Sequence, residues 1–340
     1  MTPSSWFYYL IAFLMAYFLT WMVRKYAIQR NVIDVPNARS SHTRPTPRGG
    51  GVAFVVTFLL LGLVSAVLLP FNSDTATALL GSGVLIALVG FMDDHGHIPA
   101  RWRLVAHFLA AAWLLYWLGG PPPITLFSLD IPAAWPLSIA LAFFLVWLLN
   151  LYNFMDGIDG IASAQAISVC IGGAFLYISH GRPEDAFYPI LLACSVAGFL
   201  VWNFPPARIF MGDAGSGFLG ITLGGLTIQA AWIDNQLFWS WIILSGVFIS
   251  DATWTLIRRL ARKEKVYEAH RSHAYQYASR RFGSHRPVTM AVVAINAFWL
   301  FPMAYLASAG TYDPTLIALV AYVPLCLLAY TFKAGQQEQA

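Results

Sequence analysis

The segment PLSIALAFFLVWLLNLYNFMDGIDG, residues 136–160, decides the fold. It opens with an apolar run of the length that crosses a bilayer as a helix, roughly 17–25 residues. It ends in four polar residues, Asn150, Asn153, Asp156 and Asp159, at every third position. On a helix that spacing keeps side chains near one face. A helix cap and turn would be the simplest interpretation. Because ionisable groups beside an apolar span are costly and usually functional, we interpret the segment as a membrane helix with a functional polar stripe.

Apolar runs of this kind recur along the whole chain. Of its 340 residues, 58% are hydrophobic and only 11% are charged, against about 25% charged in a soluble domain. We therefore predict an all-α polytopic membrane protein, a single domain over 1–340, with about eleven transmembrane helices. The first run lacks a basic region and a small-residue cleavage site, so we expect no cleavable signal peptide. The predicted spans are 6–23, 52–69, 79–92, 104–118, 136–152, 161–179, 187–203, 216–233, 237–257, 288–307 and 315–332.

Lysine and arginine are distributed unequally between the loops. Alternate loops hold 19 of these residues against 1 in the others, and the segments 24–51 and 258–287 alone hold six and nine. The positive-inside rule places the basic loops in the cytoplasm, the N-terminus outside and the C-terminus inside. This rule also accounts for the net charge of +4, so we expect no nucleic-acid partner. Most of the unusual polar motifs then lie on the cytoplasmic face, where we predict an active-site cleft.

Two adjacent carboxylates, Asp93 and Asp94, end the third span. Such a pair repels unless a positive group lies beside it. The pair is either a solvated helix end or a site that binds a divalent cation or positions a substrate.

A glycine-rich segment, 203–217, leads into the eighth span and contains Asp213 and Ser216. Glycines before a helix N-terminus expose backbone N–H groups that suit phosphate. Asp213 would suit Mg²⁺, which prefers carboxylate oxygens together with substrate phosphate. The alternative is close helix packing by small residues, which we expect of Gly220-x-x-x-Gly224 further along.

Two basic loops contain further candidates. Arg44 and Arg48 lie in a loop rich in proline and glycine, and the arginine fork matches phosphate. The last loop contains Arg271 and the spacing His270-x-x-His273. Positive-inside orientation and anchoring to anionic lipid are the alternative explanations. A zinc pair at the histidines would lack further nearby ligands.

These segments, in this order, resemble the polyprenyl-phosphate N-acetylhexosamine-1-phosphate transferase family, from about Asp34 to Gln276. That family makes the first lipid intermediate of peptidoglycan and initiates O-antigen and teichoic-acid synthesis. The resemblance implies ten or eleven helices in a bacterial inner membrane, a cytoplasmic cleft, a Mg²⁺ requirement with Mn²⁺ as a substitute, and UMP as the leaving product. The implied partners are undecaprenyl phosphate, a UDP-N-acetylhexosamine and membrane lipids, with a homodimer left open.

The resemblance also implies roles for single residues. Asp213 corresponds to the metal ligand, and Phe210 to the ring that stacks on uracil. Asp93, Asp94 and His273 correspond to the paired aspartates and to the retained histidine of the last loop. The residues that correspond to nucleotide- and cleft-lining positions are Asn153, Asp156, Asp159 and Asn203, with Asn150 at the start of the same polar stripe.

The chain departs from the family pattern in two places. The peptidoglycan branch has three consecutive histidines where this chain reads His273-Ala-Tyr275-Gln276. We therefore expect the O-antigen-initiating branch, with UDP-GlcNAc or a 6-deoxy sugar such as FucNAc or QuiNAc as donor. The lysine common in the first basic loop corresponds to Arg44 or Arg48.

Three alternatives remain open at this point. A peptidoglycan-type enzyme would transfer phospho-MurNAc-pentapeptide by the same chemistry. A secondary transporter would place its carboxylates near the bilayer midplane in repeated halves, but no internal repeat is evident. An intramembrane aspartyl protease could use Asp156 and Asp213, but the glycine-rich and basic loops would then have no role.

Overall fold

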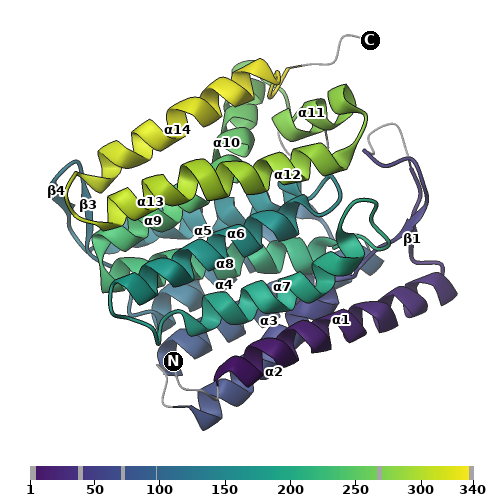
Figure 1. Ribbon diagram of the computed structural model, residues 1–340, viewed down its shortest axis with the longest axis horizontal. Helices are drawn as coiled ribbons and strands as arrows, with labels where there is room; N and C mark the ends of the chain where they lie inside the picture. The colour runs from purple at the N-terminus through teal and green to yellow at the C-terminus, as the bar shows by residue number, and fades with distance from the viewer. Residues whose placement is uncertain (1–4, 37–40, 70–72, 97, 266–269, 337–340) are drawn as a thin grey trace.

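The computed structural model is almost entirely helical (Figure 1). It describes residues 5–36, 41–69, 73–96, 98–265 and 270–336. The α-helices are α1 Ser5–Gln29, α2 Gly51–Leu68, α3 Ser73–His95, α4 Ala100–Trp117, α5 Trp135–Met155, α6 Ile161–Ser179, α7 Phe187–Asn203, α8 Asp213–Ile233, α9 Asn235–Leu244, α10 Gly246–Ala261, α11 Ala274–Phe282, α12 His285–Ile295, α13 Phe301–Ser308 and α14 Pro314–Thr331. A π-helical turn, Asn296–Leu300, joins α12 to α13.

Two short antiparallel strand pairs lie at opposite ends of the helix bundle (Figure 1). Strand β1, Ile33–Asp34, pairs with β2, Thr46–Pro47, in the first basic loop. Strand β3, Ile124–Leu126, pairs with β4, Leu129–Ile131, in the hairpin between α4 and α5.

The prediction of an all-α membrane protein is confirmed, and each predicted span lies on helix. Within the described residues, eight helices are long and apolar enough to cross a membrane, and a ninth span forms if α9 and α10 are joined. Helix α7 is just shorter than these, with 17 residues. Helix α4 is not among them because Arg101, Arg103 and His107 make its first half polar.

The predicted span 237–257 is not straight. Helices α9 and α10 meet at an angle of 69° at Ser245. A Ser–Gly pair is a frequent site of helix kinks, and Gly246 follows directly. Periodicity could not show this break, because the residues on both sides of it are apolar.

Helix α8 lies at the centre of the bundle (Figure 1), with 89% of its most apolar window buried. Glycines permit this close packing. A Cβ added at Gly220 would lie 2.5 Å from Leu149 Cα on α5. The prediction that Gly220 and Gly224 pack helices together is therefore confirmed, and the buried α8 gives the site a rigid foundation.

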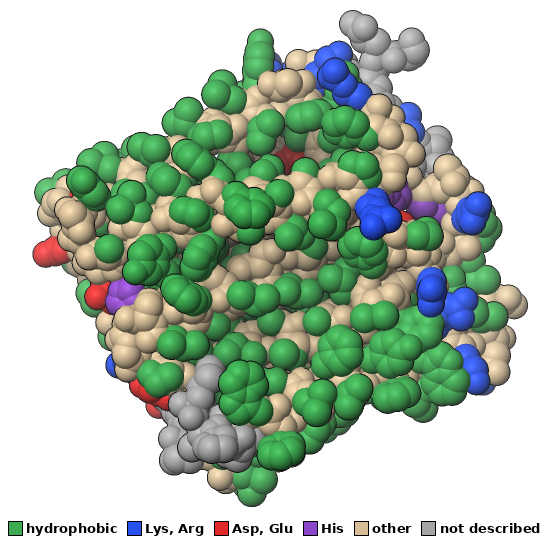
Figure 2. Space-filling view, in the orientation of Figure 1, with side chains coloured by type: hydrophobic (Ala, Val, Ile, Leu, Met, Phe, Trp, Pro, Cys, Tyr) green, Lys and Arg blue, Asp and Glu red, His purple; other side chains and the backbone are tan. Residues whose placement is uncertain are grey.

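The two ends of the bundle differ in charge (Figure 2). We call the basic end the one where α1, α3, α5 and α7 finish and α2, α4, α6 and α8 begin; the far end is the opposite one. Most of the Lys and Arg side chains in view gather at the basic end, acidic side chains mark the far end, and apolar side chains cover the face between them. Helix α1 begins at the far end and α14 finishes at the basic end (Figure 1), which agrees with an odd number of crossings.

Candidate active site

The glycine-rich loop meets the end of α3 at the first residues of α8. Gly212 has φ 80° and ψ 170°, and a Cβ added there would lie 2.7 Å from Asp94 Oδ2. On α3, a Cβ at Gly90 would lie 2.5 Å from the backbone nitrogen of Ala214. Both glycines are therefore needed for the two chain segments to approach this closely.

Asp94 caps the N-terminus of α8. Its carboxylate accepts hydrogen bonds from the backbone N–H groups of Asp213 (3.2 Å) and Ala214 (3.3 Å). It also pairs with Arg48 from the first basic loop, and its side chain is only 1% exposed. A carboxylate at a helix N-terminus is stabilised by the helix dipole and by the unpaired N–H groups. Asp94 thus joins α3, α8 and the basic loop.

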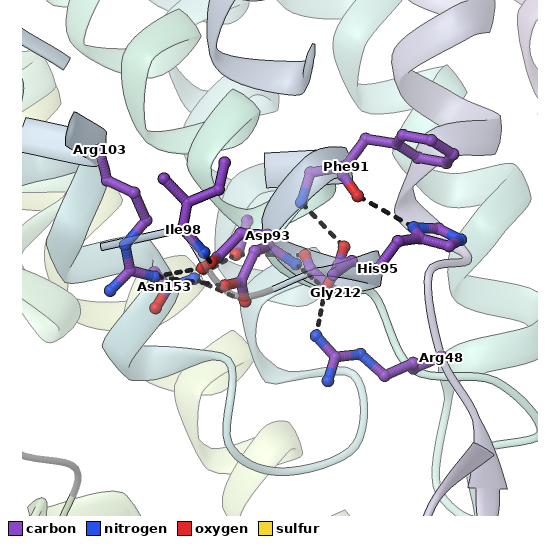
Figure 3. A network of polar contacts seen from close by, with 12 residues as sticks. Arg48, Phe91, Asp93, His95, Ile98, Arg103, Asn153 and Gly212 are labelled. Atoms are coloured by element: carbon purple, nitrogen blue, oxygen red, sulfur yellow. Dashed lines mark hydrogen bonds and ion pairs between the residues drawn. The ribbon is translucent and has the colours of Figure 1, made fainter. Parts of the chain in front are cut away.

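Asp93 points to a different partner. It pairs with Arg103 of α4 and accepts a hydrogen bond of 2.9 Å from the backbone N–H of Ile98. Figure 3 shows Arg103 and Arg48 on opposite sides of Asp93. The positive groups that the adjacent carboxylates require are therefore two arginines from separate segments, Arg48 of the first basic loop and Arg103 of α4. Arg103 was not among the predicted site residues.

Asp213 is the more open carboxylate of this network, with 33% of its side chain exposed. Asn153 Nδ2 donates to Asp213 Oδ1 (3.0 Å) and to Ser216 Oγ (3.2 Å). Arg103 Nη1 lies 3.8 Å from Asp213 Oδ2. The polar stripe of α5 thereby fixes the orientation of the carboxylate that begins α8.

Arg48, Asn153, Asp213 and Ser216 line a cavity of about 260 Å³ at the basic end. Its walls come from the first basic loop, the end of α5 and the loop after it, the glycine-rich loop, and the start of α12. Its polar and aromatic lining residues are Asp34, Ser41, His42, Arg48, Asn153, Asp156, Asp159, Asn203, Phe210, Asp213, Ser216, Gln276 and His285. Asp93 and Arg103 line a smaller pocket beside it.

Comparison with known proteins places this cavity in a family. Residues 76–231 match Glycosyl transferase family 4, and this region contains the paired aspartates, the polar stripe and the glycine-rich loop. Over these residues the chain is similar to glycosyl transferase family 4. The predicted resemblance to the polyprenyl-phosphate N-acetylhexosamine-1-phosphate transferases is thus confirmed.

Two relatives match nearly the whole length of the chain. A probable undecaprenyl-phosphate N-acetylglucosaminyl 1-phosphate transferase of Bacillus subtilis is 27% identical, over 94% of this chain and 90% of the relative. A decaprenyl-phosphate N-acetylglucosaminephosphotransferase of Mycolicibacterium smegmatis is 29% identical, over 93% and 84%. A phospho-N-acetylmuramoyl-pentapeptide-transferase of Moorella thermoacetica is 35% identical, but over only 54% of this chain and 61% of the relative.

The two aspartates after α5 have different surroundings in this site. Asp156 lines the cavity, and burial, together with Asp213, Asp159 and Asp94, raises its pKa well above the ordinary value. Asp159 binds protein instead: Oδ2 accepts from the backbone N–H of Ala207 (2.9 Å) and Oδ1 lies 3.1 Å from His285 Nδ1. Asp156 is therefore the member of the pair with the greater need for a cationic ligand.

Two other predicted residues, Asn203 and Asn150, are held by hydrogen bonds to the protein. Asn203 lines the cavity, but its amide already binds the N–H of Gly160 (3.0 Å) and the C=O of Ile209 (3.0 Å). Asn150 lines a smaller neighbouring pocket, where its Nδ2 donates to Val146 O (2.7 Å). Both side chains hold the backbone that carries the cavity-lining groups.

Six predicted residues are not among those that line the cavity: Arg44, Asp93, Asp94, Asn150, Arg271 and His273. Arg44 is exposed in the first basic loop, and Arg271 lies in the last loop. His273 is only 3% exposed, with Nδ1 3.2 Å from Asp251 Oδ1. Burial and the neighbouring His273 and Arg259 lower the pKa of His270 to about 3, so His270 is neutral at pH 7. In the described parts of this loop, the structure brings Gln276 to the cavity in place of His273.

His42, Gln276 and His285 line the cavity but were not predicted. The ring of His42 lies edge-on to Phe210, with centroids 4.8 Å apart, and its Nε2 is buried without a hydrogen-bond partner within the described residues. His285 Nε2 lies 3.0 Å from Ser41 O, which ties α12 to the first basic loop. The unpaired His42 nitrogen beside Phe210 indicates that a ligand with polar groups fits there.

The residues present fit a divalent cation held partly by substrate. No three His, Cys, Asp or Glu side chains come together as a complete metal site in the described chain. Mg²⁺, however, commonly takes only one or two carboxylates, with phosphate oxygens and waters as its other ligands. Asp213, open to the cavity and oriented by Asn153, fits that role, and Asp156 would supply a second carboxylate.

Proposed function

We propose that this chain transfers N-acetylhexosamine 1-phosphate from a UDP-sugar to undecaprenyl phosphate, releasing UMP. The observation that carries the proposal is the cavity at the N-terminus of α8, where Asp156, Asp213 and the ring of Phe210 meet. The arginine-paired aspartates lie at the start of α8 next to this cavity. The relatives that match nearly the whole chain are named for polyprenyl-phosphate N-acetylglucosamine-phosphate transfer. The product would initiate a surface glycan such as O-antigen.

The reaction joins two anions. An oxygen of the lipid phosphate attacks the sugar-bearing phosphorus of the UDP-sugar. A new P–O bond forms, the bond to the bridging oxygen breaks, and UMP leaves with the electron pair. A phosphate monoester has its second pKa near 6, so the attacking group is largely a dianion at pH 7. The site therefore has to neutralise charge more than it has to remove a proton.

The protein groups divide this work. Arg48 in the cavity and Arg103 in the smaller pocket beside it provide positive charge while they hold the paired aspartates. Asp213 and Asp156 would hold Mg²⁺, which stabilises charge on the diphosphate and on the departing UMP when it is bound. Asn153 keeps Asp213 oriented for that purpose.

The acceptor needs an apolar path to the same site. An apolar groove of about 160 Å³ lies between α10, α11, α12 and α14, with Tyr275, Val288 and Phe332 among its lining residues. Tyr275 and Val288 are close in sequence to Gln276 and His285, which line the cavity. The groove therefore could guide the polyprenyl chain so that its phosphate reaches the cavity.

The test of the function is a panel of nucleotide sugars. We expect purified protein with undecaprenyl phosphate and Mg²⁺ to release UMP from a UDP-N-acetylhexosamine but not from UDP-MurNAc-pentapeptide. The last loop presents Ala274, Tyr275 and Gln276 after His273, and these side chains cannot provide the contacts of three imidazoles. Plain UDP-glucose should be poor because it leaves partners of the N-acetyl group unpaired.

Two outcomes of the panel would count against the proposal. Faster turnover of UDP-MurNAc-pentapeptide than of any N-acetylhexosamine would assign the chain to the peptidoglycan branch. Absence of UMP release from every UDP-sugar would contradict the proposed reaction itself.

Replacing Phe210 by Ala tests the nucleotide position. Phe210 lines the cavity beside His42, and base–aromatic stacking contributes roughly 1–3 kcal/mol. We expect KM for the UDP-sugar to rise about 5- to 150-fold by that energy, with little change in KM for the lipid. Phe210→Leu, which keeps apolar bulk, serves as the control for packing. An unchanged nucleotide KM in Phe210→Ala would exclude stacking at this ring.

The orientation in the membrane is tested by labelling. In a variant without native cysteines, single cysteines are introduced at exposed positions Ala133 and Tyr312 of the far end, and Thr43 and Arg281 of the basic end. We propose that the basic end faces the cytoplasm of a bacterial inner membrane, because of the charge asymmetry. An impermeant thiol reagent should then label 133 and 312 in intact cells, and 43 and 281 only after permeabilisation. Labelling of 43 in intact cells would contradict this topology.

A further inference from the structure

A second cavity, of about 550 Å³, lies at the far end of the bundle. It is formed by the start of α3, the end of α4, the loop 180–186 and the end of α8. The transfer reaction uses none of these residues, since the candidate active site lies at the basic end. The far-end cavity therefore needs its own explanation.

A buried glutamine in this cavity lacks a partner for its acceptor. Gln229 is only 7% exposed, and its Nε2 donates to Asp185 Oδ1 at 3.0 Å. That bond fixes which way the amide faces, since a carboxylate can only accept. Gln229 Oε1 then has no hydrogen-bond partner within the described residues. A buried acceptor without a donor is costly, so a ligand that donates hydrogen bonds would stabilise it.

The charge of the cavity indicates what kind of donor fits. Among the described residues that line it, Asp74 and Asp185 are acidic and Arg182 is the single cation. Arg182 pairs with Asp185 at 2.9 Å and with Glu184 at 3.0 Å, so one arginine offsets three carboxylates. Helices α4 and α8 both present their C-terminal ends, which carry partial negative charge. The N-terminal end of α3 has the opposite sign, but Asp74 lies in its first turn and offsets it. The excess negative charge favours a cationic ligand over a neutral sugar.

Aromatic side chains supply the rest of the lining. Tyr116, Trp117 and Trp232 lie at the ends of α4 and α8. Aromatic faces attract ammonium groups, and Trp and Tyr at helix ends mark the depth of the lipid head groups. A cationic ligand at this depth is most readily a lipid head group.

We propose that the far-end cavity binds the head group of a phospholipid that carries a primary ammonium, as phosphatidylethanolamine does. The ammonium donates to Gln229 Oε1 and to the carboxylate of Asp185, while Arg182 lies beside the phosphate. The acyl chains remain in the bilayer along the exposed sides of α4, where Leu109 and Trp113 are 58% and 42% exposed. The proposal is independent of the transfer reaction.

The experiment uses the full chain, delipidated in detergent, and measures its Tm. Short-chain phosphatidylethanolamine, phosphatidylcholine and phosphatidylglycerol with equal acyl chains are added separately, as is water-soluble phosphoethanolamine. Gln229→Leu removes the unpaired acceptor. Trp232→Leu is a second variant at a side chain 44% exposed, so it leaves no buried void. Asp130→Asn, in the hairpin at the same end and outside the cavity, is the matched control.

We expect phosphatidylethanolamine to raise the Tm of the wild type and of Asp130→Asn more than the other two lipids do. This preference should be lost in Gln229→Leu and in Trp232→Leu. Equal shifts with all three lipids, or a preference that persists in both cavity variants, would overturn the proposal. If phosphoethanolamine alone reproduces the shift, the cavity is an ammonium site for a soluble amine and its assignment to lipid is wrong.

Discussion

Replacing Asp213 by Asn is expected to abolish transfer and to leave the protein inserted and folded. An Asn side chain at this position keeps the oxygen that accepts from Asn153 Nδ2, 3.0 Å away in the wild type, so the start of α8 should be preserved. The negative charge that would hold the cation is lost. Because electrostatic stabilisation of the transition state by a single group accounts for about 10²–10³ in rate, kcat should fall at least that far. The measurement is UMP release at saturating Mg²⁺.

Asp130→Asn at the far end removes a carboxylate of the same size and serves as its control. It should keep full activity, and both variants should show the wild-type thermal midpoint. Substantial transfer by Asp213→Asn at saturating Mg²⁺ would contradict the proposed metal-binding role. A fall in the thermal midpoint would instead show that the carboxylate supports the fold.

The second large effect is expected at the Arg48–Asp94 pair. Arg48→Ala leaves the Asp94 carboxylate, 1% exposed, with the two N–H groups of α8 as its remaining partners among the described residues. Breaking a buried pair costs about 3–5 kcal/mol. Because the Arg48 side chain is 35% exposed, we expect a loss near the lower limit, about 3 kcal/mol. The free energy of unfolding, measured by SDS titration in mixed micelles, tests this value.

A double variant separates loss of the pair from loss of arginine packing. Asp94→Asn in the Arg48→Ala background removes the uncompensated charge, so it should recover part of the lost stability. Arg281→Ala, at an exposed arginine of the same end, should have little effect. If Asp94→Asn makes Arg48→Ala less stable still, then Asp94 acts mainly as the cap of α8 and the charge pair contributes little.

The fold was largely predictable because each membrane helix is encoded by its own continuous stretch of sequence. A long apolar run is enough to predict a membrane span. The distribution of Lys and Arg between the loops predicts which end of the bundle faces the cytoplasm. The break at Ser245 was missed, since helix direction on each side of it depends on tertiary packing. The predicted third span begins at residue 79, after the start of α3 at Ser73, because the first turn of this helix is polar.

The site was predictable where one short segment holds the functional groups together. Asn153, Asp156 and Asp213 line one cavity as the polar stripe and the glycine-rich loop indicate. Arg103, by contrast, reaches Asp93 from the next helix, and a single arginine at a helix start carries no spacing signal. His273 matches the motif of the last loop, but in the structure its ring contacts Asp251 on α10. A sequence motif cannot show this contact, because the two residues lie on separate segments of the chain.

The central position of α8 has a consequence for how the chain enters the membrane. Among the eight single helices of spanning length in the described chain, α8 has the lowest mean hydropathy, 1.3, and the largest buried share, 89%. A helix that is almost entirely buried among other helices is under little selection to be strongly apolar, and its glycines are weak drivers of insertion. We therefore expect α8 to pass poorly from the translocon into lipid by itself. It should be stabilised in the membrane by packing against α3 and α5, which are synthesised earlier. The residue that begins this helix, Asp213, would then reach its place only after the helices that orient it.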